Sequence, residues 1–220
     1  MEDIKRNLLV INQKIDRACK IYQKDRSKVN LIAVSKKMAT DKIQQAIAAG
    51  QIDFGENYIQ EAKEKWPQIK KDYPNLKLHF IGNFQSKKAK EIVELFDCIH
   101  TLSSQSAAES LKKEMSKSGK DMEILVQVNI GDEDQKGGIE LSKLQEFIKY
   151  CHDIDLKISG LMCIPPSGEL ASPYFALLNK YARENNLQKL SMGMSADFEE
   201  AIAMDSNYIR VGTAIFGPRD

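Results

Sequence analysis

Short apolar runs and amphipathic stretches follow one another in a regular order along the chain. The first amphipathic stretch has apolar residues at spacings of three and four, which predicts a helix running to about Lys24. The next apolar run, residues 31–34, is continuous, as in a strand that is buried on both faces. This run ends abruptly in Ser35 and Lys36, so we expect Lys36 to be held at the rim of a core.

The same order of strand and helix repeats to the end of the sequence. We predict eight strands, at residues 31–34, 52–54, 76–81, 98–102, 123–130, 158–164, 189–192 and 208–211. Seven helical segments separate them, with Thr40 or Asp41 expected to cap the first and Gly50 to end it. The later segments include residues 86–96, 142–151 and 197–204, and residues 131–138 read as a polar loop.

Strands that alternate with helices form parallel sheets. Eight of them close most economically into a (β/α)₈ TIM barrel, here with an additional N-terminal helix, and an open doubly wound sheet is the alternative. Only nine residues follow Val211, so the eighth helix is nearly missing and we expect the N-terminal helix to cover the gap. No linker composition divides the chain, and we expect residues 1–220 to form a single α/β domain.

Composition narrows the class of protein further. The 32 basic and 31 acidic residues leave a formal charge of +1, which gives no broad basic surface for nucleic acid or for an anionic membrane. The four cysteines are far apart without a C-x-x-C pair, which favours a reducing, cytoplasmic location. No signal peptide core precedes the first helix, and no run of about 18 apolar residues suggests a membrane span.

Candidate chemistry lies just after the predicted strands, because these ends share one face of a barrel. An amine fixed there, as in Lys36, can be desolvated, lowered in pKa and used as a nucleophile toward a carbonyl. The segment from Ser191 to Ser195 offers two hydroxyls and a glycine, and Gly212-Thr213 offers another pair, as a phosphate site requires. The alternative for Ser195 is a helix cap.

Other polar residues leave two interpretations open. Arg210 interrupts an apolar strand and faces either a ligand or an acid such as Glu56. Asn57 reads as a helix cap more readily than as a ligand contact, and Lys136 as part of a solvated turn. The histidines lack metal-ligand spacing, so a structural role is expected for each of His79, His100 and His152, and no metal site is predicted.

Taken together, these motifs resemble the pyridoxal-phosphate homeostasis protein family, across nearly the whole chain. The matching segments are Ala33-Val34-Ser35-Lys36, Phe54-Gly55-Glu56-Asn57-Tyr58, His79-Phe80-Ile81-Gly82, Gly160-Leu161-Met162, Leu190 to Ser195, and Ile209 to Gly217. Two departures lie at one rim: Asn83-Phe84 stands where the family usually has Pro-Leu, and Lys87 where Asn is common.

The resemblance implies a single barrel similar to the N-terminal domain of alanine racemase that binds pyridoxal 5′-phosphate (PLP). It implies Lys36 as the aldimine lysine, with Ser195, Gly212 and Thr213 around the phosphate, Arg210 at the pyridine nitrogen and Asn57 near the ring. Ser191 is expected among the cofactor-binding residues as well. The implied role is vitamin B6 and amino-acid homeostasis without catalysis. The resemblance implies a cytoplasmic monomer whose partners are PLP and PLP-accepting apoenzymes.

Physical chemistry supports a non-catalytic role. Arginine keeps its proton, so opposite the ring nitrogen it donates a hydrogen bond without protonating the ring, which weakens PLP as an electron sink. The alternative is a racemase-like PLP enzyme whose second base comes from Tyr58, His79 or a partner chain. A third alternative is an interaction protein with a vestigial PLP site. The presence of Lys36 argues against this alternative.

Overall fold

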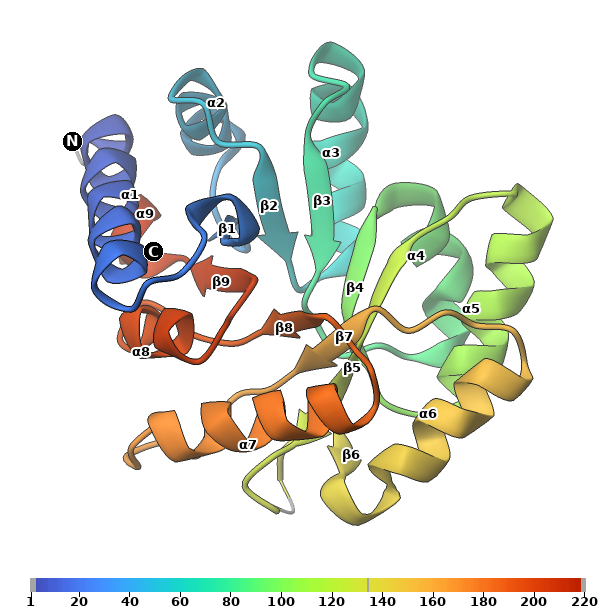
Figure 1. Cartoon of the computed structure of the whole chain (residues 1–220). Helices are drawn as coiled ribbons and strands as arrows, with labels where there is room; N and C mark the ends of the chain where they lie inside the picture. Colours follow the sequence, from blue (N-terminus) through green and yellow to red (C-terminus); the bar gives the residue numbers. More distant parts are fainter. Residues whose placement is uncertain (1–2, 134, 219–220) are drawn as a thin grey trace.

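Eight parallel strands close into a barrel in the computed structural model, which describes residues 3–133 and 135–218 (Figure 1). Pairing of β4 with β5 closes the sheet, so the (β/α)₈ prediction is confirmed and the open-sheet alternative is wrong. The barrel strands are β1 (Asn30–Val34), β2 (Asp53–Glu56), β3 (Lys77–Phe80), β4 (Cys98–Leu102), β5 (Glu123–Asn129), β7 (Gly160–Met162), β8 (Lys189–Ser191) and β9 (Tyr208–Val211).

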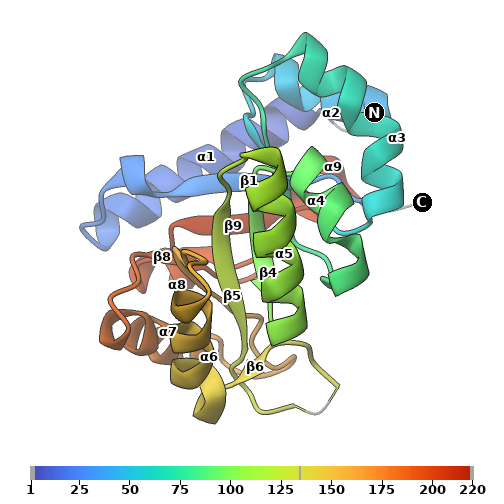
Figure 2. The ribbon, with the colours of Figure 1, turned by 90° about the vertical axis from the view of Figure 1, so that its right-hand side faces the viewer.

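Helices surround the barrel on its outer side (Figures 1 and 2). They are α1 (Ile4–Ile21), α2 (Thr40–Ala48), α3 (Ile59–Asp72), α4 (Ala89–Leu95), α5 (Gln105–Ser118), α6 (Leu144–Asp153), α7 (Ser172–Glu184), α8 (Phe198–Ala203) and α9 (Thr213–Phe216). Short 3₁₀ turns η1 (Arg26–Lys28), η2 (Ser86–Lys88) and η3 (Leu141–Lys143) complete the connections. The predicted N-terminal helix is present as α1, which contacts α2, α8 and α9.

Each strand has an inner and an outer face, and both are buried. In β1, Leu31 and Ala33 join the large apolar cluster shared with the helices, whereas Ile32 points into the barrel. Inside the barrel, Ile32 packs with Cys98, Leu125, Met162 and Tyr208. Because side chains alternate along β9, Arg210 lies on the same inner face as Tyr208, as the sequence suggested.

Several predicted details are wrong, and most concern element ends. The first residue before α2 is Ala39, so neither Thr40 nor Asp41 is its N-cap residue. Helix α1 ends at Ile21 and not near Lys24, because Gln23 has a positive φ of 54° and leaves the helical conformation. Two short elements were not predicted: β6 (Ile139–Glu140), which pairs with β5, and the four-residue α9 after Gly212.

No helix in the described part of the chain has both the length and the apolar composition needed to cross a bilayer.

Candidate functional site

A pocket of about 310 Å³ opens at the C-terminal ends of the barrel strands. Six of the seven predicted site residues line it: Lys36, Asn57, Ser195, Arg210, Gly212 and Thr213. They come from the ends of β1, β2, β8 and β9, so closure of the barrel brings together residues that are up to 177 positions apart. Apolar side chains, including Val34, Ile81, Met162 and Ile164, complete the lining. A mixed lining of this kind suits a small organic ligand with a few polar groups.

Lys36 follows β1 on a loop that its neighbours hold firmly. The Ser35 amide donates to the Gly55 carbonyl at 3.0 Å. The Lys65 ammonium donates to the carbonyls of Ser35, before Lys36, and of Met38, after it, at 3.1 and 3.2 Å. Lys65 was not singled out in the sequence, because a lysine on the face of a helix usually reads as a solvated charge.

A buried carboxylate lies beneath this loop. Glu56 Oε1 accepts from Ser35 Oγ at 2.8 Å and from Trp66 Nε1 at 3.1 Å, and it forms an ion pair with Lys65 Nζ at 3.1 Å. Burial raises the pKa of Glu56, although Lys65 opposes that effect. The alternative in which Glu56 pairs with Arg210 is therefore wrong.

Arg210 lies at the floor of the pocket with its guanidinium buried. Its Nη1 donates to Ser191 Oγ at 2.6 Å, and its Nη2 donates to the Cys163 carbonyl at 3.0 Å. No carboxylate within the described residues forms an ion pair with it. Burial lowers the pKa of Arg210, but an arginine in a protein remains a cation and a donor. Ser191, the seventh predicted residue, thus lies under the pocket against Arg210 and does not line it.

Asn57 is placed by close contact with the turn after β3. A Cβ added to Gly82 would lie 2.0 Å from the Asn57 carbonyl oxygen, so only glycine allows this approach. Asn57 does not cap α3, whose N-cap residue is Tyr58. Its Oδ1 is instead buried without a hydrogen-bond partner in the described structure. An acceptor left in this state on the wall of a pocket fits a ligand that brings a donor.

The hydroxyls of Ser195 and Thr213 lie at the exposed part of the pocket. Ser195 is not a helix cap, because the N-cap residue of α8 is Asp197. The Asp197 carboxylate accepts from the Met194 amide at 2.5 Å, which fixes this turn. Gly193, with φ of +91° and Ala201 2.5 Å from an added Cβ, lets the turn lie directly on α8. Two hydroxyls and the Gly212 backbone therefore converge beside Lys36.

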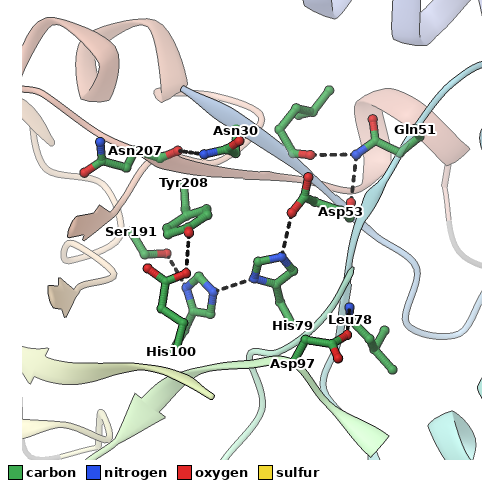
Figure 3. Close-up of polar contacts among 12 residues, drawn as sticks. Asn30, Gln51, Asp53, Leu78, His79, Asp97, His100, Ser191, Asn207 and Tyr208 are labelled. Carbon is green, nitrogen blue, oxygen red and sulfur yellow. Dashed lines mark hydrogen bonds and ion pairs between the residues drawn. The ribbon is translucent and has the colours of Figure 1, made fainter. Parts of the chain in front are cut away.

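The histidines differ from one another in a way that the sequence did not reveal. His79 and His100 are buried in the barrel interior and hydrogen bonded to each other (Figure 3). The His152 side chain, by contrast, is 91% exposed. His79, His100 and Cys98 form a group whose ligand atoms lie within 4.8 Å of one another, close enough to hold a metal ion. Sequence spacing could not predict this group, because His79 lies on β3 whereas Cys98 and His100 lie on β4. The hydrogen bond already joins the two nitrogens, and burial raises the pKa of the Cys98 thiol well above its usual range, which disfavours a thiolate ligand.

Two loops near the pocket also differ from expectation. Lys136 is not in a solvated turn: it pairs with Glu133 and donates to the Pro165 carbonyl at 2.8 Å, which ties the loop after β5 to the loop after β7. At the rim after β3, Phe84 is buried against Phe80, whereas Asn83 and Lys87 are exposed. Phe84 therefore packs in the core, and Asn83 and Lys87 lie at the surface.

Comparison with known proteins agrees with this geometry. A family model described as "Alanine racemase, N-terminal domain" matches residues 4–220. The pyridoxal phosphate homeostasis protein of Pasteurella multocida is 38% identical over 228 residues, which cover 99% of this chain and 98% of that protein. The chain belongs to the pyridoxal phosphate homeostasis protein family.

Solved structures extend the comparison. PipY of Synechococcus elongatus, a structure with PLP bound, has a TM-score of 0.80 and 34% identity, covering 93% of this chain and 100% of that one. Alanine racemase of Clostridium difficile has a TM-score of 0.73 at 12% identity, and the match covers 98% of this chain but 56% of that one. The racemase therefore has the same barrel fold as this chain. At 12% identity the comparison shows the shared fold and nothing about function.

Proposed function

We propose that this protein binds PLP in the pocket at the C-terminal ends of the strands, holds it covalently on Lys36, and acts in cytoplasmic PLP and amino-acid homeostasis. The observation that carries the proposal is the convergence of an amine, a buried guanidinium, an unpartnered amide oxygen and two hydroxyls in one pocket of about 310 Å³. The family of the chain and the PLP-bound relative support the same ligand.

Each part of PLP has a matching group in the pocket. The Lys36 amine adds to the aldehyde carbon with loss of water, which leaves a carbon–nitrogen double bond between them. Ser195, Gly212 and Thr213 would hold the phosphate at the exposed part of the pocket, where a dianion keeps some of its water. Arg210 would meet the ring nitrogen at the buried floor, and Asn57 would accept a hydrogen bond from the ring substituents.

The pocket supports storage and release more than catalysis. Racemisation at the α-carbon of an amino acid requires a second base besides the lysine, close to the reacting atoms. Of the two intramolecular candidates, Tyr58 is 49% exposed and His79 is 1% exposed within the barrel, and neither lines the pocket. Exposed hydroxyls at the phosphate end suit exchange of PLP with solution and with PLP-accepting apoenzymes, a role that a monomer can fill.

Titration of the purified protein with PLP tests the proposal. We expect the visible absorption of a PLP Schiff base, its loss on borohydride reduction, and a stable phosphopyridoxyl label on the peptide that contains Lys36. The Lys36→Ala variant should show neither the band nor the label. Lys37→Ala is a matched control, because Lys37 is an exposed neighbour on the same loop that does not line the pocket.

Amino-acid turnover distinguishes the remaining alternative. A carrier transfers PLP to an apoenzyme without exchanging the α-proton of free amino acids for deuterium. Exchange that requires Lys36 would instead identify a racemase-like enzyme. A protein that gains neither the band nor the label with excess PLP would contradict the binding proposal itself.

A further inference from the structure

A chain of polar side chains crosses the barrel interior and ends at Arg210. Asp53 Oδ1 lies 2.9 Å from His79 Nε2, and His79 Nδ1 lies 2.9 Å from His100 Nε2 (Figure 3). His100 Nδ1 is 2.7 Å from Ser191 Oγ, which accepts from Arg210 Nη1 at 2.6 Å. The chain joins β2, β3, β4, β8 and β9, and none of its first four members lines the pocket.

When each imidazole carries a single hydrogen, the Asp53 carboxylate fixes the direction of every hydrogen bond in this chain. An arginine can only donate, and an ionised carboxylate can only accept. His79 Nε2 must therefore carry the hydrogen that faces Asp53, which leaves His79 Nδ1 as an acceptor for His100 Nε2–H. His100 Nδ1 is then an acceptor for the Ser191 hydroxyl, whose oxygen is left to accept from Arg210.

The opposite direction would be costly. If His100 Nδ1 donated to Ser191, neutral His79 would present a bare nitrogen to the Asp53 carboxylate, and two acceptors would face each other at 2.9 Å. His79, His100 and Ser191 are at most 1% exposed, so water cannot readily relieve such a contact. The Tyr208 ring, whose hydroxyl donates to Glu123, lies against both imidazoles at 5.5 and 5.2 Å between ring centroids.

We propose that Asp53, His79, His100 and Ser191 are positioning residues that hold Arg210 at the pocket floor, so that the pocket selects a ring with a hydrogen-bond acceptor at its buried edge. The inference rests on the proposed PLP function. Ser191 and Cys163 occupy two of the five N–H donors of Arg210 and set the plane of the guanidinium. The remaining donors are thereby aimed before any ligand arrives, which lowers the ordering cost of binding.

The first test uses the protein without PLP. The chain has three histidines, so long-range ¹H–¹⁵N spectra of the imidazoles can be assigned readily. We expect His79 and His100 each to carry a single hydrogen on Nε2, while exposed His152 serves as the internal control with averaged tautomers. A hydrogen on His100 Nδ1 would overturn the proposed direction, whatever the protein binds.

The second test measures selectivity for the ring nitrogen. Binding of PLP is compared with binding of deaza-PLP, in which a C–H group replaces that nitrogen. We expect the unmodified protein to prefer PLP by about tenfold and Ser191→Ala to lose most of this preference, because its Arg210 is no longer held. A structural defect alone would weaken both ligands equally.

Variants at Asp53 test transmission from the far end of the chain. Asp53→Asn keeps an oxygen that accepts from His79 and should keep the preference, whereas Asp53→Leu should reduce it several-fold. If the unmodified protein binds neither ligand, the proposed function fails. If it binds and prefers PLP, but Ser191→Ala and Asp53→Leu prefer it equally, this inference fails and the proposed function stands.

Discussion

Buried polar residues carry out two separate tasks at the pocket. Glu56, Ser35 and Lys65 fix the loop that bears Lys36, through hydrogen bonds below 3.2 Å. The chain from Asp53 to Ser191 holds Arg210 from the opposite side. Both groups pay a desolvation cost, and among their buried side-chain oxygen and nitrogen atoms Glu56 Oε2 alone lacks a hydrogen-bond partner. The positions of Lys36 and Arg210 are therefore fixed by buried neighbours that do not line the pocket.

Titration of His100 gives a prediction at this scale. Burial, together with His79 and Arg210, holds the pKa of His100 well below its usual range. Below about pH 6.5 the unfolded chain therefore takes up a proton that the folded protein does not. Above that pH the group leaves the free energy of unfolding unchanged. Below it, the free energy of unfolding falls as the pH decreases, by up to about 1.4 kcal/mol per pH unit.

Urea denaturation at several pH values measures the effect. The unmodified protein should lose up to about 2 kcal/mol between about pH 6.5 and pH 5 through this group, and His100→Gln should lose correspondingly less. His152→Gln is the matched control, since its side chain is 91% exposed and its replacement should leave the slope unchanged. An equal slope in the unmodified protein and in His100→Gln would contradict the prediction.

At the scale of elements, the loops after the strands determine the shape of the pocket. Gly82 after β3 lies against the Asn57 backbone after β2, and Thr101 on β4 donates to the Gly82 carbonyl at 2.6 Å. Three neighbouring strands thus fix one wall of the pocket. Because the atoms in contact are backbone atoms, no side chain can rotate to make room there.

Gly82→Ala should therefore damage both stability and binding. We expect a loss of about 1–3 kcal/mol in the free energy of unfolding, as for other overpacked sites, and a weaker affinity for PLP because Asn57 is displaced. Gly137→Ala is the control, since an added Cβ there meets only Gln127 Nε2 at 3.8 Å. Thermal melts and PLP titrations of both variants check this, and a normal affinity in Gly82→Ala would show that Asn57 tolerates displacement.

The strands and helices differ in how well the sequence predicts them. The barrel strands were predictable because each is a short apolar run with both faces buried. Six of the seven candidate residues line one pocket because parallel strands share one carboxyl-terminal edge, whereas their roles stay predictions. Helix ends were less predictable: Ala39 precedes α2 without a capping side chain. The Asp53–His79–His100–Ser191 chain was missed because its members are far apart in sequence, and only barrel closure brings β3 and β4 opposite β8.

At the scale of the whole molecule, the first and last elements of the described chain support each other. Helix α1 contacts α8 and α9, and Asn7 Nδ2 donates to the Ile215 carbonyl in α9 at 2.9 Å. Since α9 has only four residues, α1 covers the side of the barrel that a full eighth helix would occupy. Gly212 and Thr213 lie at the start of this region, so the packing of α1 supports the proposed phosphate end of the pocket.

Weakening the inner face of α1 should therefore destabilise the entire barrel. Ile15 is 0% exposed, and Ile15→Ala should cost about 2–5 kcal/mol of unfolding free energy because it leaves a cavity in the core. Leu9 on the same helix is 58% exposed, and Leu9→Ala should change stability by no more than about 0.5 kcal/mol. Urea unfolding followed by both circular dichroism and Trp66 fluorescence should show one shifted transition, because α1 and the barrel unfold together. Separate transitions for the two probes would instead show that α1 detaches from a barrel that remains folded.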